Sequence, residues 1–221
     1  THIRRRDEIG RLASSFDHMA HSLDATQERL RLVVAANQRF VPADLLGLIG
    51  RGDVGEVRPG DHVERTMTVL FGVMEVGDPK RDRLSPEENL ALVNEYLRIV
   101  SPIVLQNRGI LAAHTANILT LLFTDSPIHA VDAALQMQQE LRTYNALRKG
   151  QGGLPINLAI GMHAGNVMLG IVGNEDRMAS TVLSPVTRTA WELATIAKTL
   201  GYVSLASDTV LEVIRDDPSR H

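Results

Sequence analysis

Arg65-Thr66-Met67-Thr68-Val69-Leu70-Phe71-Gly72-Val73 predicts a buried strand, because the run is rich in β-branched and apolar residues. Ser85-Pro86-Glu87-Glu88 follows and has the form of a capping box, which predicts a long helix that ends near Asn107. A strand followed by a helix indicates the start of a mixed domain.

The residues downstream predict the remaining elements of this domain. Two short strands, Ile110 to His114 and Ile118 to Phe123, precede a second long helix, which Ser126-Pro127 opens and which ends near Lys149. Two strands, Leu154 to His163 and Asn166 to Val172, are expected next, separated by Ala164-Gly165. A further strand near Thr181, a helix from Val186 to Leu200 and a final strand from Val203 to Ala206 complete the domain. This order is typical of a ferredoxin-like α+β fold, an antiparallel-rich sheet with helices on one face, which leaves the other face free for a partner.

A long helix is expected ahead of this domain. Its apolar positions follow alternating steps of three and four, with polar Thr26 and Asn37 in the same seam: Ile9, Leu12, Phe16, Met19, Leu23, Leu30 and Val33. Such a heptad seam predicts a parallel coiled-coil dimer. An amphipathic helix packed on its own domain is the alternative interpretation.

Composition excludes several classes of site. The chain has no cysteine, so disulfides and thiolate metal sites are excluded. The 23 basic and 26 acidic residues leave no basic excess for a nucleic acid. No apolar run approaches the roughly 20 residues of a membrane helix, so the chain by itself is expected to be soluble. The histidines show no paired metal-ligand spacing, and we expect no metal and no cofactor.

The start of the long helix carries a family resemblance. Asp7-Glu8-Ile9-Gly10-Arg11-Leu12, followed by Phe16 and Met19, resembles the second helix of a HAMP module. HAMP modules are dimeric relays just inside bacterial membranes. The resemblance implies an upstream membrane segment and a signalling coiled coil on the cytoplasmic side of the bacterial inner membrane.

Three ordered stretches of the globular part carry a second resemblance. They are Glu64 to Phe71 with Ser85 to Glu88 and Leu92 to Leu97 behind it, Gly109-Ile110 leading to Leu121 to Phe123, and Ala159 to Val167 followed by Leu169-Gly170 and Gly173 to Met178. Together they resemble class III adenylate and guanylate cyclase domains. The resemblance implies a site shared between two subunits. Two aspartates hold metal ions on the triphosphate, lysine and aspartate read the adenine, asparagine orients the ribose, and arginine stabilises the transferring phosphate.

This chain departs from that pattern in every role. Val73 and Asn117 stand at the positions of the two metal aspartates. Ala113 and Pro185 stand at the positions of the adenine-reading lysine and aspartate. Arg188 replaces the ribose asparagine, and Glu192 replaces the phosphate arginine. Because both halves of a shared site are lost, an active partner would not restore it. We therefore expect a pseudoenzyme with no catalytic residues, acting as a homodimeric signalling module with an unknown downstream protein partner.

Two alternatives to this interpretation stay open. The former nucleotide cleft is a candidate small-molecule or nucleotide site, with Arg188 and Gly165 as possible ligand contacts. An Arg188–Glu192 salt bridge and hairpin geometry at Gly165, Gly170 and Gly173 are the structural explanations for the same residues. The other alternative is a divergent cyclase that still makes a cyclic nucleotide. The expected domains are a HAMP helix with coiled coil (1–38), a linker with a short helix (39–63) and the cyclase homology domain (64–221).

Overall fold

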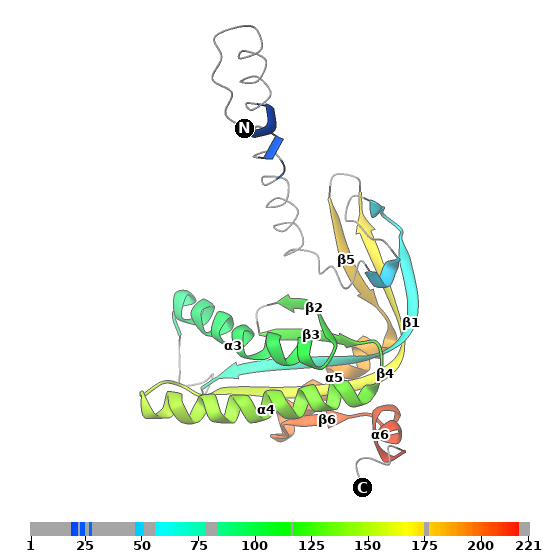
Figure 1. Ribbon diagram of the computed structural model, residues 1–221. Helices are drawn as coiled ribbons and strands as arrows, with labels where there is room; N and C mark the ends of the chain where they lie inside the picture. Colours follow the sequence, from blue (N-terminus) through cyan, green and yellow to red (C-terminus); the bar gives the residue numbers. More distant parts are fainter. Residues whose placement is uncertain are drawn as a thin grey trace, which may run out of the picture. The chain divides into compact units, whose positions relative to one another are not determined.

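A computed structural model describes residues 19–21, 23–24, 27, 47–50, 56–77, 84–115, 117–174 and 177–216 (Figure 1). The globular part contains, in chain order, β1 (His62–Val76), α3 (Pro86–Gln106), β2 (Gly109–Thr115), β3 (Ile118–Phe123), α4 (Pro127–Gly150), β4 (Ile156–Gly173), β5 (Met178–Leu183), α5 (Pro185–Leu200), β6 (Ser204–Ala206) and α6 (Asp208–Arg215). The described strands form one sheet in the order β2-β3-β1-β4-β5, and β6 pairs parallel to β4. The predicted α+β class and ferredoxin-like plan are confirmed.

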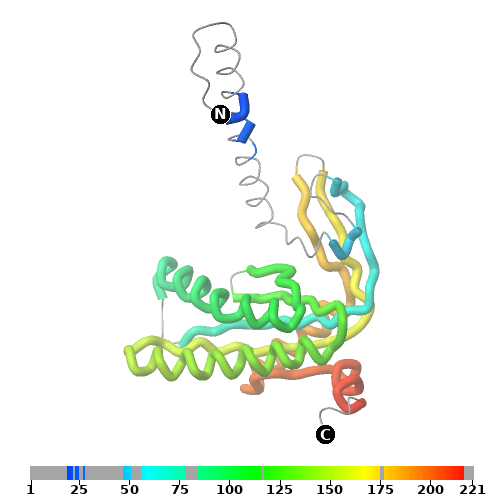
Figure 2. Tube along the Cα trace, viewed as in Figure 1, coloured from blue at the N-terminus to red at the C-terminus, as the bar shows by residue number. Residues whose placement is uncertain are grey.

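The pairing of β1 with β4 organises the sheet. It runs without interruption from His62 opposite Gly170 to Val76 opposite Ile156. The two strands stay side by side through a pronounced bend, which Figure 2 shows along the trace. The predicted strand break at Ala164-Gly165 was wrong, because both residues lie in this ladder, opposite Thr68 and Met67. The turn comes later, between β4 and β5.

Helices cover both faces of the sheet. On one face α3 and α4 enclose a core that includes Leu70, Met74 and Tyr96. On the other face α5 packs on a second core, which includes Met67, Val69 and Ala190. The expectation that helices cover one face only was therefore wrong for α5. Successive residues of β1 point to opposite faces and are apolar on both, with Leu70 in the first core and Val69 in the second.

Local capping explains where the helices start. The Ser85 side chain accepts a hydrogen bond from the Glu88 N–H at 3.2 Å, and Glu88 Oε2 accepts one from the Ser85 N–H at 2.8 Å. This completes the predicted capping box of α3. Ser126 and Ser184 cap α4 and α5 in a similar way, each followed by a proline in the first turn. The short helix α6 was not predicted.

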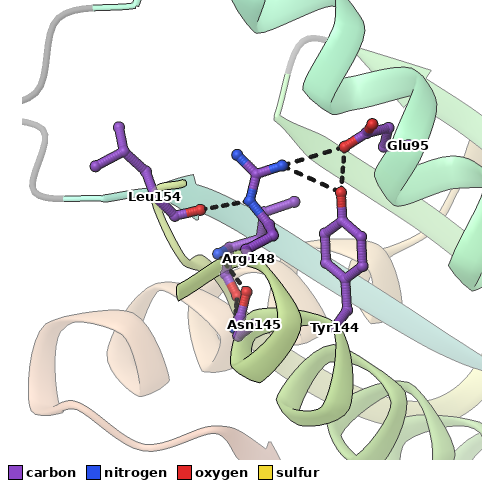
Figure 3. Close-up of polar contacts among 6 residues, drawn as sticks. Glu95, Tyr144, Asn145, Arg148 and Leu154 are labelled. Carbon is purple, nitrogen blue, oxygen red and sulfur yellow. Dashed lines mark hydrogen bonds and ion pairs between the residues drawn. The ribbon is translucent and has the colours of Figure 1, made fainter. Parts of the chain in front are cut away.

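Side chains of α4 bind the start of β4. Asn145 Nδ2 donates to the Ile156 carbonyl and Asn145 Oδ1 accepts from the Ile156 N–H, both at 2.8 Å. Arg148 Nε donates to the Leu154 carbonyl at 2.7 Å (Figure 3). Arg148 Nη1 also contacts Glu95 of α3 at 3.2 Å and the Tyr144 hydroxyl at 3.1 Å. The Tyr144 hydroxyl in turn donates to Glu95, so this cluster fixes the connection from α4 to β4.

One glycine allows α5 to lie directly against the sheet. A Cβ atom at Gly161 would lie 2.2 Å from both the Ala190 carbonyl oxygen and the Ala194 backbone nitrogen. Ala190, Ala194 and Ala197 are fully buried at this contact. The backbone of β4 therefore touches the backbone of α5, which leaves no room for a side chain at position 161.

Little of the predicted N-terminal seam falls on described residues. Met19 and Leu23 are helical and 63% and 58% exposed. The other apolar seam residues lie outside the described residues: Ile9, Leu12, Phe16, Leu30 and Val33. No helix in the described ranges is long and apolar enough to cross a membrane.

We predict that Gly161→Ala lowers the free energy of unfolding by about 3 kcal/mol, because the overlap is with backbone atoms that cannot rotate away. Urea unfolding of the purified domain measures the change. Gly150→Ala is the matched control, since a Cβ atom there has no neighbour within 4 Å. Equal stability of the two variants would contradict the close approach of α5 and β4.

Candidate functional site

The fold brings the two metal positions of the resemblance together. Val73 is 5% exposed on β1 and lies opposite Ile118 on β3. Asn117, which precedes β3, reaches the next residue of β1: its Nδ2 donates to the Met74 carbonyl at 3.0 Å, and its own carbonyl accepts from the Met74 N–H at 2.8 Å. Val73 and Asn117 are therefore neighbours where β3 begins beside β1, and neither side chain offers a carboxylate.

These residues do not fit the metal ions that the family uses. Mg²⁺ prefers oxygen ligands, chiefly carboxylates, whereas Val73 is apolar and the amide of Asn117 is occupied as a hydrogen-bond donor. Glu75 is the one acid between Phe71 and Gly77, and it forms an ion pair with Lys198 Nζ of α5 at 2.8 Å. Within the described part of the chain, no group of three or more acidic or histidine side chains is placed to hold a metal.

The three family positions on α5 lie at its first turns. Pro185 is exposed at the start of the helix, directly after the capping residue Ser184. Arg188 Nε contacts Glu192 Oε1 at 3.0 Å, and the two side chains are 82% and 55% exposed. The interpretation of these two residues as a salt bridge along one helix face matches the structure. Such an exposed pair contributes little to stability, so its effect is mainly to neutralise the charge of Arg188.

Ala113, at the position of the adenine-reading lysine, lines a pocket on the face of the sheet that α5 covers. We call this cavity of about 260 Å³ the bend pocket. Its apolar lining comes from Ile49, Phe71, Ala112, Ala113, Leu169 and Val182, with the backbone of Gly170. Its hydroxyl groups come from Thr120, Ser180, Thr181 and Thr187. Among the described residues that line it, none carries a charge.

An aromatic contact links the bend pocket to α5. Phe71 meets Trp191 edge to face, with ring centroids 6.0 Å apart. Trp191 is the only tryptophan in the chain and is 38% exposed. Phe71 therefore contacts both the pocket and the helix that carries Arg188 and Glu192.

The glycines of the third motif have separate structural roles. At Gly165 a Cβ atom would lie 2.7 Å from a methyl carbon of Val186, so this glycine makes room for the first turn of α5. Gly173 has φ +130° and forms part of the β4–β5 connection, as expected from hairpin geometry. Neither Gly165 nor Arg188 belongs to the lining of the bend pocket, whereas Gly170 does.

His163 joins β4 to the start of α6. Its Nδ1 lies 2.7 Å from the Ser207 hydroxyl and 3.2 Å from the Thr209 hydroxyl. Thr209 also donates to the Ala164 carbonyl at 3.1 Å. Burial lowers the pKa of His163, which favours the neutral imidazole at pH 7. This network explains the histidine as a structural connection.

The sequence interpretation did not identify the bend pocket. Its hydroxyl residues Ser180 and Thr181 lie in the stretch that the family resemblance covers, but they occupy none of its catalytic positions. The single tryptophan was the one compositional signal near the pocket. The cavity is lined by residues from five strands, α5 and Ile49, and no local sequence pattern specifies how these segments come together.

We predict that Asn117→Asp, which restores a carboxylate at the second metal position, lowers the free energy of unfolding by about 1–2 kcal/mol at neutral pH. The carboxylate cannot donate to the Met74 carbonyl and instead faces it. Urea unfolding checks this, with Asn89→Asp on the exposed first turn of α3 as the control. An Asn117→Asp variant as stable as the parent would show that the amide bond is unimportant.

Comparison with known proteins supports the resemblance. No protein-family model matches the chain. The adenylate cyclase of Anabaena cylindrica is 29% identical over 212 residues, which cover 94% of this chain and 42% of that protein. The chain spans less than half the length of the curated relatives it matches.

Solved structures share the fold. A bacterial light-regulated adenylyl cyclase superposes with a TM-score of 0.75 at 19% identity, covering 90% of this chain and 59% of that chain. The guanylyl cyclase Cya2 gives a TM-score of 0.60 at 24% identity, covering 70% and 80% of the two chains. By its ordered motifs and these relatives, the globular part of the chain is similar to adenylate cyclases, and it has the fold of class III adenylate and guanylate cyclase domains.

Proposed function

We propose that this chain is a catalytically inactive cyclase homology domain that works as a dimeric signal-transduction module of a membrane receptor. The observation that carries the proposal is the donor set at the metal positions. Val73 has no ligand atom, the Asn117 amide is bonded to Met74, and Glu75 is paired with Lys198. A cyclase needs metal ions to polarise the attacking hydroxyl and to neutralise the triphosphate.

The residues for base reading and for stabilising the phosphate are replaced as well. One missing electrostatic stabiliser typically costs about 10²–10³ in rate. Here Glu192 would place a negative charge where the family has an arginine, and Ala113 offers no group to read a base. Losses within one catalytic unit do not add simply, but no subset of the site remains to support turnover.

The scaffold supports a role in signalling. Helices pack on both faces of the sheet and α5 contacts β4 directly, which suits a module that passes on a change in packing. The HAMP resemblance and the heptad seam supply the input: a helix displaced at the membrane would alter how two copies of the domain meet. A downstream protein would then read the new arrangement.

The first test is turnover. We expect no cyclic AMP or cyclic GMP above the buffer blank from the purified chain with ATP or GTP and with Mg²⁺ or Mn²⁺. An active class III cyclase assayed alongside is the positive control. Turnover that Glu75→Gln abolishes would instead support a divergent cyclase with an unusual metal ligand.

The second test is the oligomeric state. We expect Leu23→Asp to shift the chain from dimer towards monomer in sedimentation velocity at micromolar concentration, because an apolar seam residue would be replaced by a charge. His21→Asp introduces the same charge off the seam and should leave the dimer intact. A monomeric parent chain, or equal effects of the two variants, would remove the coiled-coil argument.

A further inference from the structure

The lining of the bend pocket has the composition of a binding site for an uncharged molecule. Six apolar side chains and four hydroxyl side chains surround it, and no acid or base is among them. A triphosphate would bring several negative charges against this surface without a cation or metal to offset their desolvation. The pocket is therefore unsuited to the family's nucleotide, although Ala113 stands at an adenine-reading position.

The hydroxyl groups give the pocket a limited capacity for hydrogen bonds. Thr187 is already occupied, because its hydroxyl donates to the Ser184 carbonyl at 2.6 Å. Within the described part of the chain, the hydroxyls of Thr120, Ser180 and Thr181 have no hydrogen-bond partner. A ligand with one or two hydroxyl or carbonyl groups would satisfy them, and its apolar part would contact Phe71 and Leu169.

The volume limits the size of the ligand. At about 260 Å³, the cavity is smaller than the roughly 300–1,000 Å³ of sites for drug-sized molecules. The occupant would contain about one or two rings or a short branched chain. A complete nucleoside triphosphate exceeds this space.

We propose that the bend pocket binds a small, neutral, largely apolar molecule with one or two hydroxyl or carbonyl groups, and that binding is transmitted to α5 through the Phe71–Trp191 contact. The proposal rests on the signalling role proposed above, because it gives the module a chemical input at the former cyclase site. Phe71 is the link to Trp191, since it lines the pocket and meets that ring edge to face, and Thr187 of α5 lines the pocket directly.

Benzyl alcohol is a suitable probe, and benzoate is its charged counterpart with the same ring. Ligand-observed NMR on the full chain should show saturable binding of benzyl alcohol with a Kd on the order of 1 mM, consistent with a ligand of this size. Benzoate should bind at least tenfold more weakly. The emission of Trp191, the single tryptophan, should change with the same midpoint as the NMR signal.

Two variants show whether the probe occupies this pocket. Ala113→Phe should fill the cavity and abolish binding, whereas Ala179→Phe, on an exposed position of β5 outside the lining, should leave it unchanged. Thr181→Val keeps the shape, removes one hydroxyl and should weaken binding about tenfold or less. The melting temperature of each variant confirms that it is folded.

The outcomes are separable. No saturable binding of benzyl alcohol, equal binding of benzoate, or unchanged binding in Ala113→Phe would overturn the ligand proposal. Binding without a change in Trp191 emission would overturn transmission through the Phe71–Trp191 contact. Cyclic-nucleotide turnover would overturn the inactive-module proposal independently of these binding results, because the probe experiments contain no nucleotide.

Discussion

The long antiparallel pairing of β1 with β4 is the interaction on which the rest of the structure depends. Fifteen residue pairs lie in register from His62–Gly170 to Val76–Ile156. Because successive side chains of a strand point to opposite faces, one strand pair supplies apolar residues to both cores. Its bend brings Phe71 of β1 and Leu169 of β4 to the same pocket, although Phe71 lies opposite Gly161. In a flat sheet, Gly161 and Leu169 would be about 26 Å apart along the strand.

The same constraint explains why the residues at the two metal positions of the resemblance lie together although neither is a carboxylate. Val73 is held between β3 and β4, and Asn117 is held against Met74, whatever their side chains can bind. The replacements make contacts that favour the folded state. A buried valine needs no counter-charge, whereas an aspartate at that position would need a metal or another cation to offset its desolvation. Lys198 does this for Glu75, which faces the same region of α5.

The sequence predicted most elements where a local signal specifies them. Ser85, Ser126 and Ser184 accept hydrogen bonds from nearby backbone N–H groups, so helix starts can be inferred from a few residues. The strand break wrongly predicted at Ala164-Gly165 arose because no local signal specifies the structure there. A glycine inside a strand is indistinguishable by sequence from a glycine in a turn, and only the packing of Val186 against Gly165 explains it. The bend pocket was missed for a similar reason, since its residues come from five strands, α5 and Ile49.

The distribution of charge supports the proposal that the bend pocket takes a neutral ligand rather than a nucleotide. At the family positions on α5, Arg188 forms an ion pair with Glu192 on the same helix and does not belong to the lining of the bend pocket. Glu75 is paired with Lys198 in the last turn of α5, and both line a different cavity. Among the described residues that line the bend pocket, the polar atoms that can select a ligand are hydroxyls and backbone groups. A site of this kind discriminates by shape and by one or two hydrogen bonds, and occupancy can act on signalling only through packing. The Phe71–Trp191 contact joins the pocket to the exposed surface of α5, and Thr187 of the same helix lines the pocket directly.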